Sequence, residues 1–407
     1  MDPRFEKIAA TVMRHSLRIK PGEKVMISAE DDGDQLAEAL VDEAYACGAV
    51  PFVSLEQTAV RRAILSGGAS AEQLELMAKP SVTLMEQMDC YVSVSAPHNS
   101  SEFSRVPQDM LNLYTRHCKA QISRARARLR WVSLTYPNHG LAQNADMSLR
   151  EFSDYYFDLM TMDYGKLERA ALPMALRMRA ADKVRIVAPG TDLTVSLKGF
   201  TALIAAGEHN LPDGEIASTP DRLSANGTIS FNIPSLHNGF LFKDVCLTFK
   251  DGRLVDAKAN DTERFLKEIS LDDGCRYIGE FSMGTNPYVT RPVHETLFDE
   301  KMGGSMHMAL GACYNFPGRD NGNVSSIHWD LIQSHRPEHG GGEVWLDGEL
   351  VRKDGIYLPE DLRTLNPDVY FAESGAPLPL LRHTLFRKQR CRETGRDSCF
   401  TISTGGK

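Results

Sequence analysis

Residues 24–55 read KVMISAEDDGDQLAEALVDEAYACGAVPFVSL. Within this stretch, residues 24–28 and 50–55 are short apolar runs of strand length. Between them, residues 35–47 have the apolar spacing of an amphipathic helix, which ends at Gly48. A strand, a helix and a strand in this order form a unit whose strands lie parallel in one sheet. The stretch therefore predicts a layered α/β fold at the start of the chain.

The same alternation continues beyond this unit. Residues 90–95 and 129–134 are further apolar runs of strand length, and helical patterns separate them from their neighbours. Two more helices are predicted near residues 149–162 and 164–179. We therefore expect an N-terminal α/β domain over residues 1–180, built as a parallel sheet flanked by helices.

The pattern changes to hairpins after residue 180. A Pro-Gly-Thr turn joins residues 183–188 to residues 192–198, and a turn with an Asp-Gly pair joins residues 240–249 to residues 254–259. An Asp-Gly pair between two β-forming runs is a strong short hairpin signal. The second half is therefore predicted to be rich in β-strands.

We expect a β-rich α+β C-terminal domain over residues 181–363. Residues 364–407 are expected to form a C-terminal extension. They are rich in arginine and end in Thr404-Gly405-Gly406-Lys407, so part of the extension is expected to be mobile.

Composition excludes several classes of protein. A formal charge of −8 at pH 7 argues against a nucleic-acid partner, because affinity for a polyanion comes mainly from clustered lysine and arginine. No apolar stretch approaches the ~20 residues of a membrane-spanning helix, so no membrane partner is expected. The first residues lack the apolar core of a signal peptide, and the eight cysteines contain no CxxC pair. We expect a cytoplasmic protein.

Four side chains near the end of the second half are of the kinds that bind divalent metals. Residues 299–314 are predicted as a helix, on which His307 and Tyr314 are seven apart and project from one face. His328 and Asp330 are two apart on a predicted strand and therefore point to one side of a sheet. Glu280, the fourth candidate ligand, closes an apolar run.

Glu215 is a further candidate, because it stands where a loop with Pro212 and Gly214 re-enters apolar sequence. Imidazole nitrogen and carboxylate oxygen are ligands of zinc, cobalt and manganese. A lone histidine in a strand is more often a hydrogen-bonded core residue. Burying both His328 and Asp330 on one strand face, however, costs several kcal/mol unless a charge compensates, and a metal ion supplies that charge.

These segments resemble peptidase family M29, the thermophilic-type metallo-aminopeptidases. The resemblance covers roughly residues 5–358, and the extension beyond about residue 364 has no counterpart in it. Its markers are residues 17–25, 211–215, 279–287, 296–300 leading to His307, 309–311 leading to Tyr314, and 328–330. In that family, two metals are ligated by the positions that match Glu215, Glu280, His307, His328 and Asp330.

The resemblance implies a metal-dependent aminopeptidase that removes N-terminal residues from short peptides through a metal-activated water. Its cofactors would be two divalent ions, zinc, cobalt or manganese. Glu280 would bridge the ions and assist proton transfer, and Tyr314 would donate a hydrogen bond to the oxyanion. The family also implies a homodimer around an internal chamber, and residues Phe231, Phe240, Leu241 and Phe242 are expected to offer apolar surface for it.

Two other readings of the same residues remain open. His307, His328 and Asp330 are also the ligand types of a mononuclear non-haem iron centre, as in the ring-cleaving dihydroxypyridine dioxygenases, which resemble this family in fold. Glu215, Glu280 and Tyr314 favour the hydrolase with two metals. A binding or scaffold protein with a degenerate site is disfavoured, because all six positions carry competent side chains.

Overall fold

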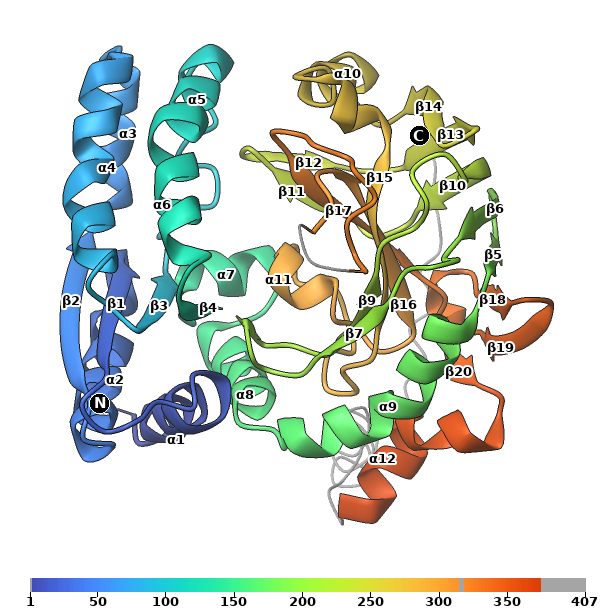
Figure 1. The fold of residues 1–407 in the computed structure, drawn as a ribbon, viewed down its shortest axis with the longest axis horizontal. Coiled ribbons are helices and arrows are strands. Elements are labelled where there is room, and N and C mark those ends of the chain that lie inside the picture. Colours follow the sequence, from blue (N-terminus) through green and yellow to red (C-terminus); the bar gives the residue numbers. More distant parts are fainter. Residues whose placement is uncertain (1, 315–317, 375–407) are drawn as a thin grey trace, which may run out of the picture.

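The computed structural model describes residues 2–314 and 318–374. Its N-terminal part is a five-stranded sheet in which all neighbouring strands run parallel, as the sequence predicts (Figure 1). In spatial order, the strands are β2 (Val50–Glu56), β1 (Lys24–Glu30), β3 (Cys90–Ser95), β4 (Arg130–Thr135) and β8 (Asn210–Leu211). The short strand β8 comes from far along the sequence, so the chain returns to this sheet after residue 180.

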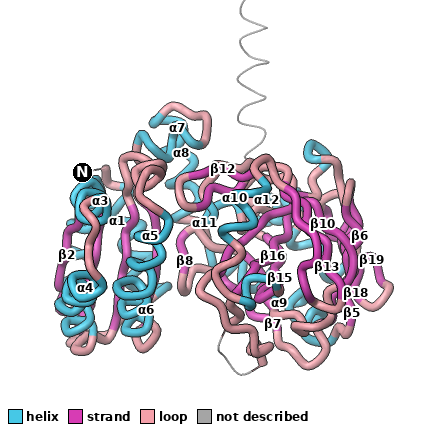
Figure 2. Tube along the Cα trace, turned by 90° about the horizontal axis from the view of Figure 1, so that it is seen from above, coloured by secondary structure: helices cyan, strands magenta, loops and turns pink. Residues whose placement is uncertain are grey.

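Helices connect and cover these strands (Figure 2). They are α1 (Arg4–Ala10), α2 (Asp34–Ala46), α3 (Thr58–Ser66), α4 (Ala71–Met85), α5 (Gln108–Tyr114), α6 (Ala120–Arg126), α7 (His139–Asn144), α8 (Leu149–Met160) and α9 (Tyr164–Ala180). Helices α1 and α5 continue into π-helical turns at Thr11–Ser16 and Thr115–Lys119.

Alternate side chains of β1 enter two separate apolar cores. Val25 and Ile27 are buried in the main core together with Leu36 of α2. Met26 lies in a smaller core with Met85 of α4. Successive strand residues point to opposite faces, so helices must cover both sides of this sheet. The prediction of a parallel sheet flanked by helices is confirmed.

The C-terminal part contains two antiparallel sheets and a separate hairpin, β11 (Ser235–His237) with β12 (Phe240–Phe242). The first sheet has the order β14 (Arg253–Lys258), β13 (Val245–Lys250), β10 (Asn226–Phe231), β6 (Thr191–Ser196), β5 (Lys183–Ala188), β18 (Glu343–Leu346), β19 (Glu349–Lys353) and β20 (Ile356–Tyr357). The second has the order β17 (His328–Ser334), β16 (Ser305–Gly311), β15 (Ile278–Gly284), β9 (Glu215–Ser218) and β7 (Ala202–Ala205).

Among the described residues, the α-helices of this part are α10 (Thr262–Glu268), α11 (Thr296–Asp299) and α12 (Pro367–Ser374). The hairpins predicted around residues 190 and 252 are confirmed as β5–β6 and β13–β14. No helix within residues 2–314 or 318–374 is both long and apolar enough to cross a membrane.

The helix predicted over residues 299–314 is wrong. The short helix α11 ends at Asp299, and residues 305–311 form β16 in the interior of the antiparallel five-stranded sheet. All seven residues of β16 are buried, so the strand lacks the alternation of apolar and polar residues that reveals a half-exposed strand. His307 therefore lies on a strand, and Tyr314 lies in the loop that follows it.

The apolar surface predicted for a dimer is only partly present. Phe231 and Phe242 are buried, and the ring of Phe242 packs against Phe265. Phe240 and Leu241 are partly exposed. Alternation along the hairpin directs about half of these side chains into the protein's own core.

The predicted domain limits at residues 180 and 363 stay a prediction. Strand β8 pairs with β4 of the N-terminal sheet although it follows residue 180. Within the predicted extension, residues 367–374 form α12, and the Lys166 ammonium of α9 donates a hydrogen bond to the Tyr370 carbonyl there (2.6 Å). Residues 375–407 lie outside the described part of the chain, and so does the predicted mobility.

Candidate metal centre

The antiparallel five-stranded sheet, β17-β16-β15-β9-β7, places the five predicted ligands on one of its faces. In the register of the sheet, Glu280 of β15 and Asp330 of β17 both pair with Ala309 of β16. Residues directly opposite each other in an antiparallel pair point to the same side. The small side chain of Ala309 therefore lies between two carboxylates and leaves space above the sheet.

The same register orients the remaining ligands. Ser282, two residues after Glu280, pairs with His307 on β16. Gly311, at the end of β16, pairs with His328 on β17. Gly284, two residues after Ser282, pairs with Glu215 on β9. Because side chains on one strand alternate with period two, all of these positions share one face.

Gly311 and Gly214 permit this arrangement. Gly311 has φ +103°, and a Cβ there would lie 2.2 Å from the Ile327 carbonyl oxygen. Gly214 has φ +131°, and a Cβ there would lie 2.7 Å from the Asn286 Cβ. Only glycine adopts these backbone conformations without strain. The loop before Glu215 and the end of β16 therefore require glycine.

The ligand atoms lie close together. Among the described residues, the side chains form three sets of three, and within each set one potential ligand atom per side chain lies within 4.8 Å of the other two. The sets are Glu215–Glu280–His307, Glu280–His328–Asp330 and Glu300–His307–Asp330. His307 Nε2 lies 3.1 Å from Glu215 Oε2, and His328 Nε2 lies 3.1 Å from Glu280 Oε2. Glu280 belongs to two of the sets, so its carboxylate lies between the two histidines.

Backbone carbonyls orient both imidazole rings. His307 Nδ1 lies 3.2 Å from the Glu300 carbonyl oxygen, and His328 Nδ1 lies 2.8 Å from the Ala312 carbonyl oxygen. A carbonyl only accepts hydrogen bonds, so Nδ1 carries the proton in each ring. Nε2 therefore faces the cluster, and in the neutral ring it offers a lone pair. This orientation is the usual one for metal-binding histidine.

Two oxygens in the cluster have unused lone pairs. Glu215 Oε2 and Asp330 Oδ1 are buried, and with neutral imidazole rings neither oxygen accepts a hydrogen bond from any described residue. Leaving a charged oxygen buried without a partner is costly. A divalent cation would satisfy both atoms, so the residues present fit the metal that the sequence predicts.

The pKa values of His307 and Glu215 also fit a cation site. Burial alone would lower the pKa of His307, but Glu215 and Asp330 raise it to about 9. Burial alone would raise the pKa of Glu215, but Lys301 and His307 bring it down to about 2. In the metal-free chain the imidazole therefore holds a proton that compensates the carboxylates. A metal ion would replace this proton, so binding would release it.

A buried lysine completes the charge balance. Lys301 Nζ lies 2.6 Å from Glu215 Oε1, 2.8 Å from Glu300 Oε1 and 3.5 Å from Asp213 Oδ1. Burial would lower the pKa of Lys301, but these three carboxylates raise it well above its ordinary value. The ammonium group binds Oε1 of Glu215, so the other oxygen of that carboxylate faces His307.

Tyr314 and Arg319 border the cluster beside His328. The Tyr314 ring centroid lies 5.5 Å from that of His328. The Arg319 guanidinium lies over the Tyr314 ring, with Cζ 4.0 Å from the ring centroid. Its Nη2 lies 3.7 Å from Glu280 Oε1. Burial raises the pKa of Tyr314 well above 10, so its hydroxyl stays protonated at neutral pH and can donate.

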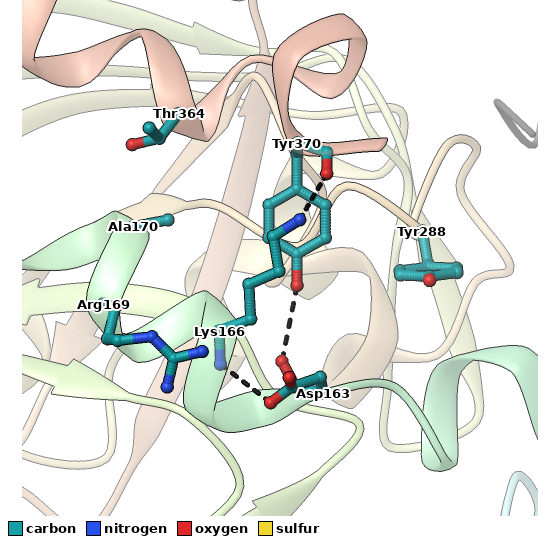
Figure 3. Close-up of a pocket in the computed structure, with 7 residues that line it drawn as sticks. All are labelled: Asp163, Lys166, Arg169, Ala170, Tyr288, Thr364 and Tyr370. Atoms are coloured by element: carbon teal, nitrogen blue, oxygen red, sulfur yellow. Dashed lines mark hydrogen bonds between the residues drawn. The ribbon is translucent and has the colours of Figure 1, made fainter. Parts of the chain in front are cut away.

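A pocket of about 550 Å³ lies on other elements (Figure 3). It is lined by Asp163, Lys166, Arg169, Ala170, Tyr288, Thr364 and Tyr370. The Lys166 side chain extends along the Tyr370 ring in this pocket, with its ammonium 4.3 Å from the ring centroid. None of the six predicted site residues lines it. The chemistry of the carboxylate and imidazole cluster, rather than the size of this pocket, identifies the candidate site.

Comparison with known proteins supports the same interpretation. The family model described as thermophilic metalloprotease (M29) matches residues 1–343. The chain belongs to this family. The family resemblance and the peptidase class predicted from the sequence are thereby confirmed. The dioxygenase alternative finds no support in these comparisons.

Individual relatives match over most of their length. Aminopeptidase PepS of Streptococcus thermophilus is 26% identical over 409 residues, which cover 87% of this chain and 96% of PepS. Aminopeptidase 2 of Geobacillus stearothermophilus is 25% identical over 87% of this chain and 95% of its own. The structure of wild-type AmpT from Thermus thermophilus superimposes with a TM-score of 0.75 at 21% identity, over 88% of this chain and 99% of AmpT, so the fold is shared.

Sequence reasoning missed several residues around the site. Lys301, Glu300 and Asp213 are buried together beside Glu215, and Ser282 donates a hydrogen bond to Glu280 Oε1 (2.7 Å). Asp213 stands two residues before Glu215, within the marker segment 211–215, and Ser282 stands two residues from Glu280 on one strand, so spacing could have indicated both. Nothing in the local sequence distinguishes the buried Lys301 from a surface lysine.

Proposed function

We propose that this chain is a metal-dependent aminopeptidase that removes N-terminal residues from short peptides. The observation that carries the proposal is that carboxylate and imidazole groups form three overlapping sets of three, and within each set the potential ligand atoms lie within 4.8 Å of one another. Membership of a metalloprotease family and relatives that are named aminopeptidases support it.

In this proposal, Glu215, Glu280, His307, His328 and Asp330 hold two divalent ions, which would be zinc, cobalt or manganese. Glu280 would contribute to both positions, because it shares one set of ligand atoms with His307 and another with His328. Divalent ions held there would supply a water molecule whose pKa is lowered toward ~7 and would polarise the carbonyl of the substrate.

The protein's own groups handle the proton and the developing charge. Glu280 accepts the proton of the attacking water and passes it to the leaving amine. The Ser282 hydroxyl, which donates to Glu280 Oε1 at 2.7 Å, fixes the orientation of this carboxylate. Tyr314 donates its hydroxyl hydrogen to the oxygen of the tetrahedral intermediate, for which its raised pKa keeps it protonated.

Metal analysis combined with a panel of aminoacyl-arylamides tests the proposal. We expect two zinc, cobalt or manganese ions per chain, and release of the arylamine that depends on them. Chelation should abolish this activity, and addition of the metal should restore it. One iron per chain with consumption of oxygen would replace the proposal with the dioxygenase alternative.

We further propose a cytoplasmic homodimer in which the site opens into a chamber that admits short peptides. The family resemblance supports the dimer, whereas Phe231 and Phe242 contribute to the core of the chain and not to its surface. Light scattering at micromolar concentration should give twice the chain mass of 45.2 kDa. A monomer mass, or cleavage of folded proteins as fast as of dipeptides, would contradict this arrangement.

A further inference from the structure

Arg319 is buried at the edge of the candidate metal centre with part of its guanidinium unpaired. The residue is 4% exposed. Neither Nε nor Nη2 finds a hydrogen-bond partner among the residues that the structure describes. Arginine stays charged at all accessible pH values, and leaving its N–H groups buried without acceptors is costly. An acceptor from outside the chain would remove this cost.

The unpaired atoms form one edge of the guanidinium. Nε–H and the nearer N–H of Nη2 are parallel, so this edge is one of the two on which arginine binds a carboxylate through two hydrogen bonds. Among the described residues, the carboxylate oxygen that faces Nη2 is Glu280 Oε1, and its distance of 3.7 Å is beyond hydrogen-bond distance. Glu280 Oε1 already accepts the hydrogen bond from Ser282.

The Tyr314 ring holds the guanidinium at the candidate site. Arg319 Cζ lies over this ring, 4.0 Å from its centroid, which is the distance of a cation–π contact. The charged edge is thus held beside Glu280 and Tyr314, the two residues to which the proposed function gives chemical roles. A group bound to Arg319 would lie next to the scissile bond.

We propose that Arg319 binds the C-terminal carboxylate of a dipeptide substrate, an inference that rests on the proposed aminopeptidase function. Two parallel N–H donors match the two oxygens of a carboxylate better than the single oxygen of a tetrahedral intermediate. In a dipeptide, the terminal carboxylate carbon is three bonds from the scissile carbonyl carbon, hence about 4 Å away. Arg319 therefore makes dipeptides better substrates than longer peptides or amides.

The test compares two substrates that differ only in the carboxylate, Leu-Gly and its C-terminal amide. Arg319→Gln should lower kcat/KM for Leu-Gly by about 10²-fold, mainly through KM, because two charge-assisted hydrogen bonds are lost. The loss on the amide should be less than about tenfold. Arg319→Lys, which keeps the charge without the fork, should give an intermediate loss on Leu-Gly.

A binding measurement gives a second readout. Calorimetry with a Leu-Gly isostere, in which CH₂–NH replaces the peptide bond, should show affinity reduced about 10²-fold in Arg319→Gln relative to the parent chain. The amide of the same isostere should discriminate little between the two proteins. This measurement does not depend on turnover.

Arg222→Gln is a matched control. Its guanidinium also stacks on a tyrosine, with Cζ 4.0 Å from the Tyr277 centroid, and it faces a carboxylate of its own, Asp273 at 3.6 Å. This variant removes the same charge and the same type of stacking contact. The ratio of kcat/KM for Leu-Gly to that for its amide should stay at the value of the parent chain.

The outcomes separate this inference from the proposed function. Equal losses on Leu-Gly and on its amide in Arg319→Gln would overturn the inference, since Arg319 would then act through Glu280 or the oxyanion. Absence of hydrolysis of both substrates and of the arylamides by the metal-loaded parent chain would instead contradict the aminopeptidase function itself.

Discussion

The parallel sheet and the five-stranded antiparallel sheet differ in where their charged side chains lie, near the surface in the first and in the interior in the second. In the parallel sheet, Glu30 lies at the end of β1, partly exposed, and pairs with Arg61 at 2.7 Å. In the antiparallel sheet, Glu280 and His307 lie within strands at 1% exposure. An ion pair near the surface costs little, whereas a buried cluster of carboxylates persists only if something compensates its charge. The contrast supports the proposed site on the antiparallel sheet.

The largest effect should come from removing a ligand on β17. His328→Ala and Asp330→Ala should each lose bound metal and lower kcat/KM by more than about 10³-fold, since residues that act as a unit fail together. Metal content by elemental analysis and arylamide hydrolysis check this. Ile27→Val in the parallel sheet should instead retain its metal and lower the free energy of unfolding by about 1 kcal/mol. Unchanged metal content in both β17 variants would remove the site assignment.

Tyr314→Phe should separate turnover from metal binding. The variant should keep its metal and lose about 10²–10³-fold in kcat, the usual loss for one oxyanion donor. Tyr277→Phe is its control, because Tyr277 is also stacked by an arginine and its hydroxyl accepts a hydrogen bond from Arg253 at 3.0 Å. That variant should keep kcat within about twofold. A normal kcat in Tyr314→Phe would make this tyrosine a packing residue only.

How far the sequence predicts the molecule also differs between the two sheets. In the parallel sheet, helices and glycines separate the strands, so the elements around β1 and β3 are found at nearly their true limits. In the antiparallel sheet, β16 is buried on both faces and reads SMHMALG without alternation, so its sequence pattern predicts a helix where the structure has a strand. Local spacing cannot distinguish a short buried strand from a helix.

The candidate site shows the same limit. His328 and Asp330 were placed correctly on one side of a strand, because their spacing of two is a local property. The helical spacing that the sequence suggests for His307 and Tyr314 is wrong, since His307 lies on β16 and Tyr314 lies in the loop after it, whereas the family resemblance names both residues. Lys301 and Arg319 were missed, because their burial depends on contacts between distant segments. Long-range pairing determines these positions, and one sequence does not reveal it.

The same substitution in both sheets sharpens the comparison. Ser282→Ala removes the hydrogen bond to Glu280 Oε1 and should weaken metal binding or kcat/KM by about 10–100-fold, as loss of a residue that orients a ligand does. Ser93→Ala removes the hydrogen bond between Ser93 and Ser133 (2.8 Å) in the parallel sheet and should cost about 1 kcal/mol of stability only. Calorimetric titration with the metal measures the first effect and thermal unfolding the second. Equal metal affinity in both variants would remove the orienting role of Ser282.

The smallest effect concerns the start of β17. Asp272 accepts hydrogen bonds from the Ser326 amide (2.7 Å), the Ser326 hydroxyl (2.6 Å) and the Ser325 hydroxyl (2.8 Å), and thereby anchors the segment that leads to His328. Burial alone would raise the pKa of Asp272, but these hydrogen bonds lower it to about 2. Lowering the pKa of Asp272 from its ordinary value near 4 to about 2 corresponds to roughly 2.5 kcal/mol, which solvent screening of this partly buried group reduces to about 1 kcal/mol.

The sign of the pH dependence follows from the lowered pKa. A carboxyl group whose pKa is lower in the folded chain stabilises the fold above its unfolded value of about 4 and loses this contribution as pH falls toward about 2. Asp272→Asn should therefore be about 1 kcal/mol less stable than the parent chain at pH 6, and the difference should shrink below pH 4. Urea unfolding at pH 6, 4 and 3 measures it. A difference that stays constant with pH would mean that the charge of Asp272 does not hold this segment, and that neutral hydrogen bonds alone anchor β17.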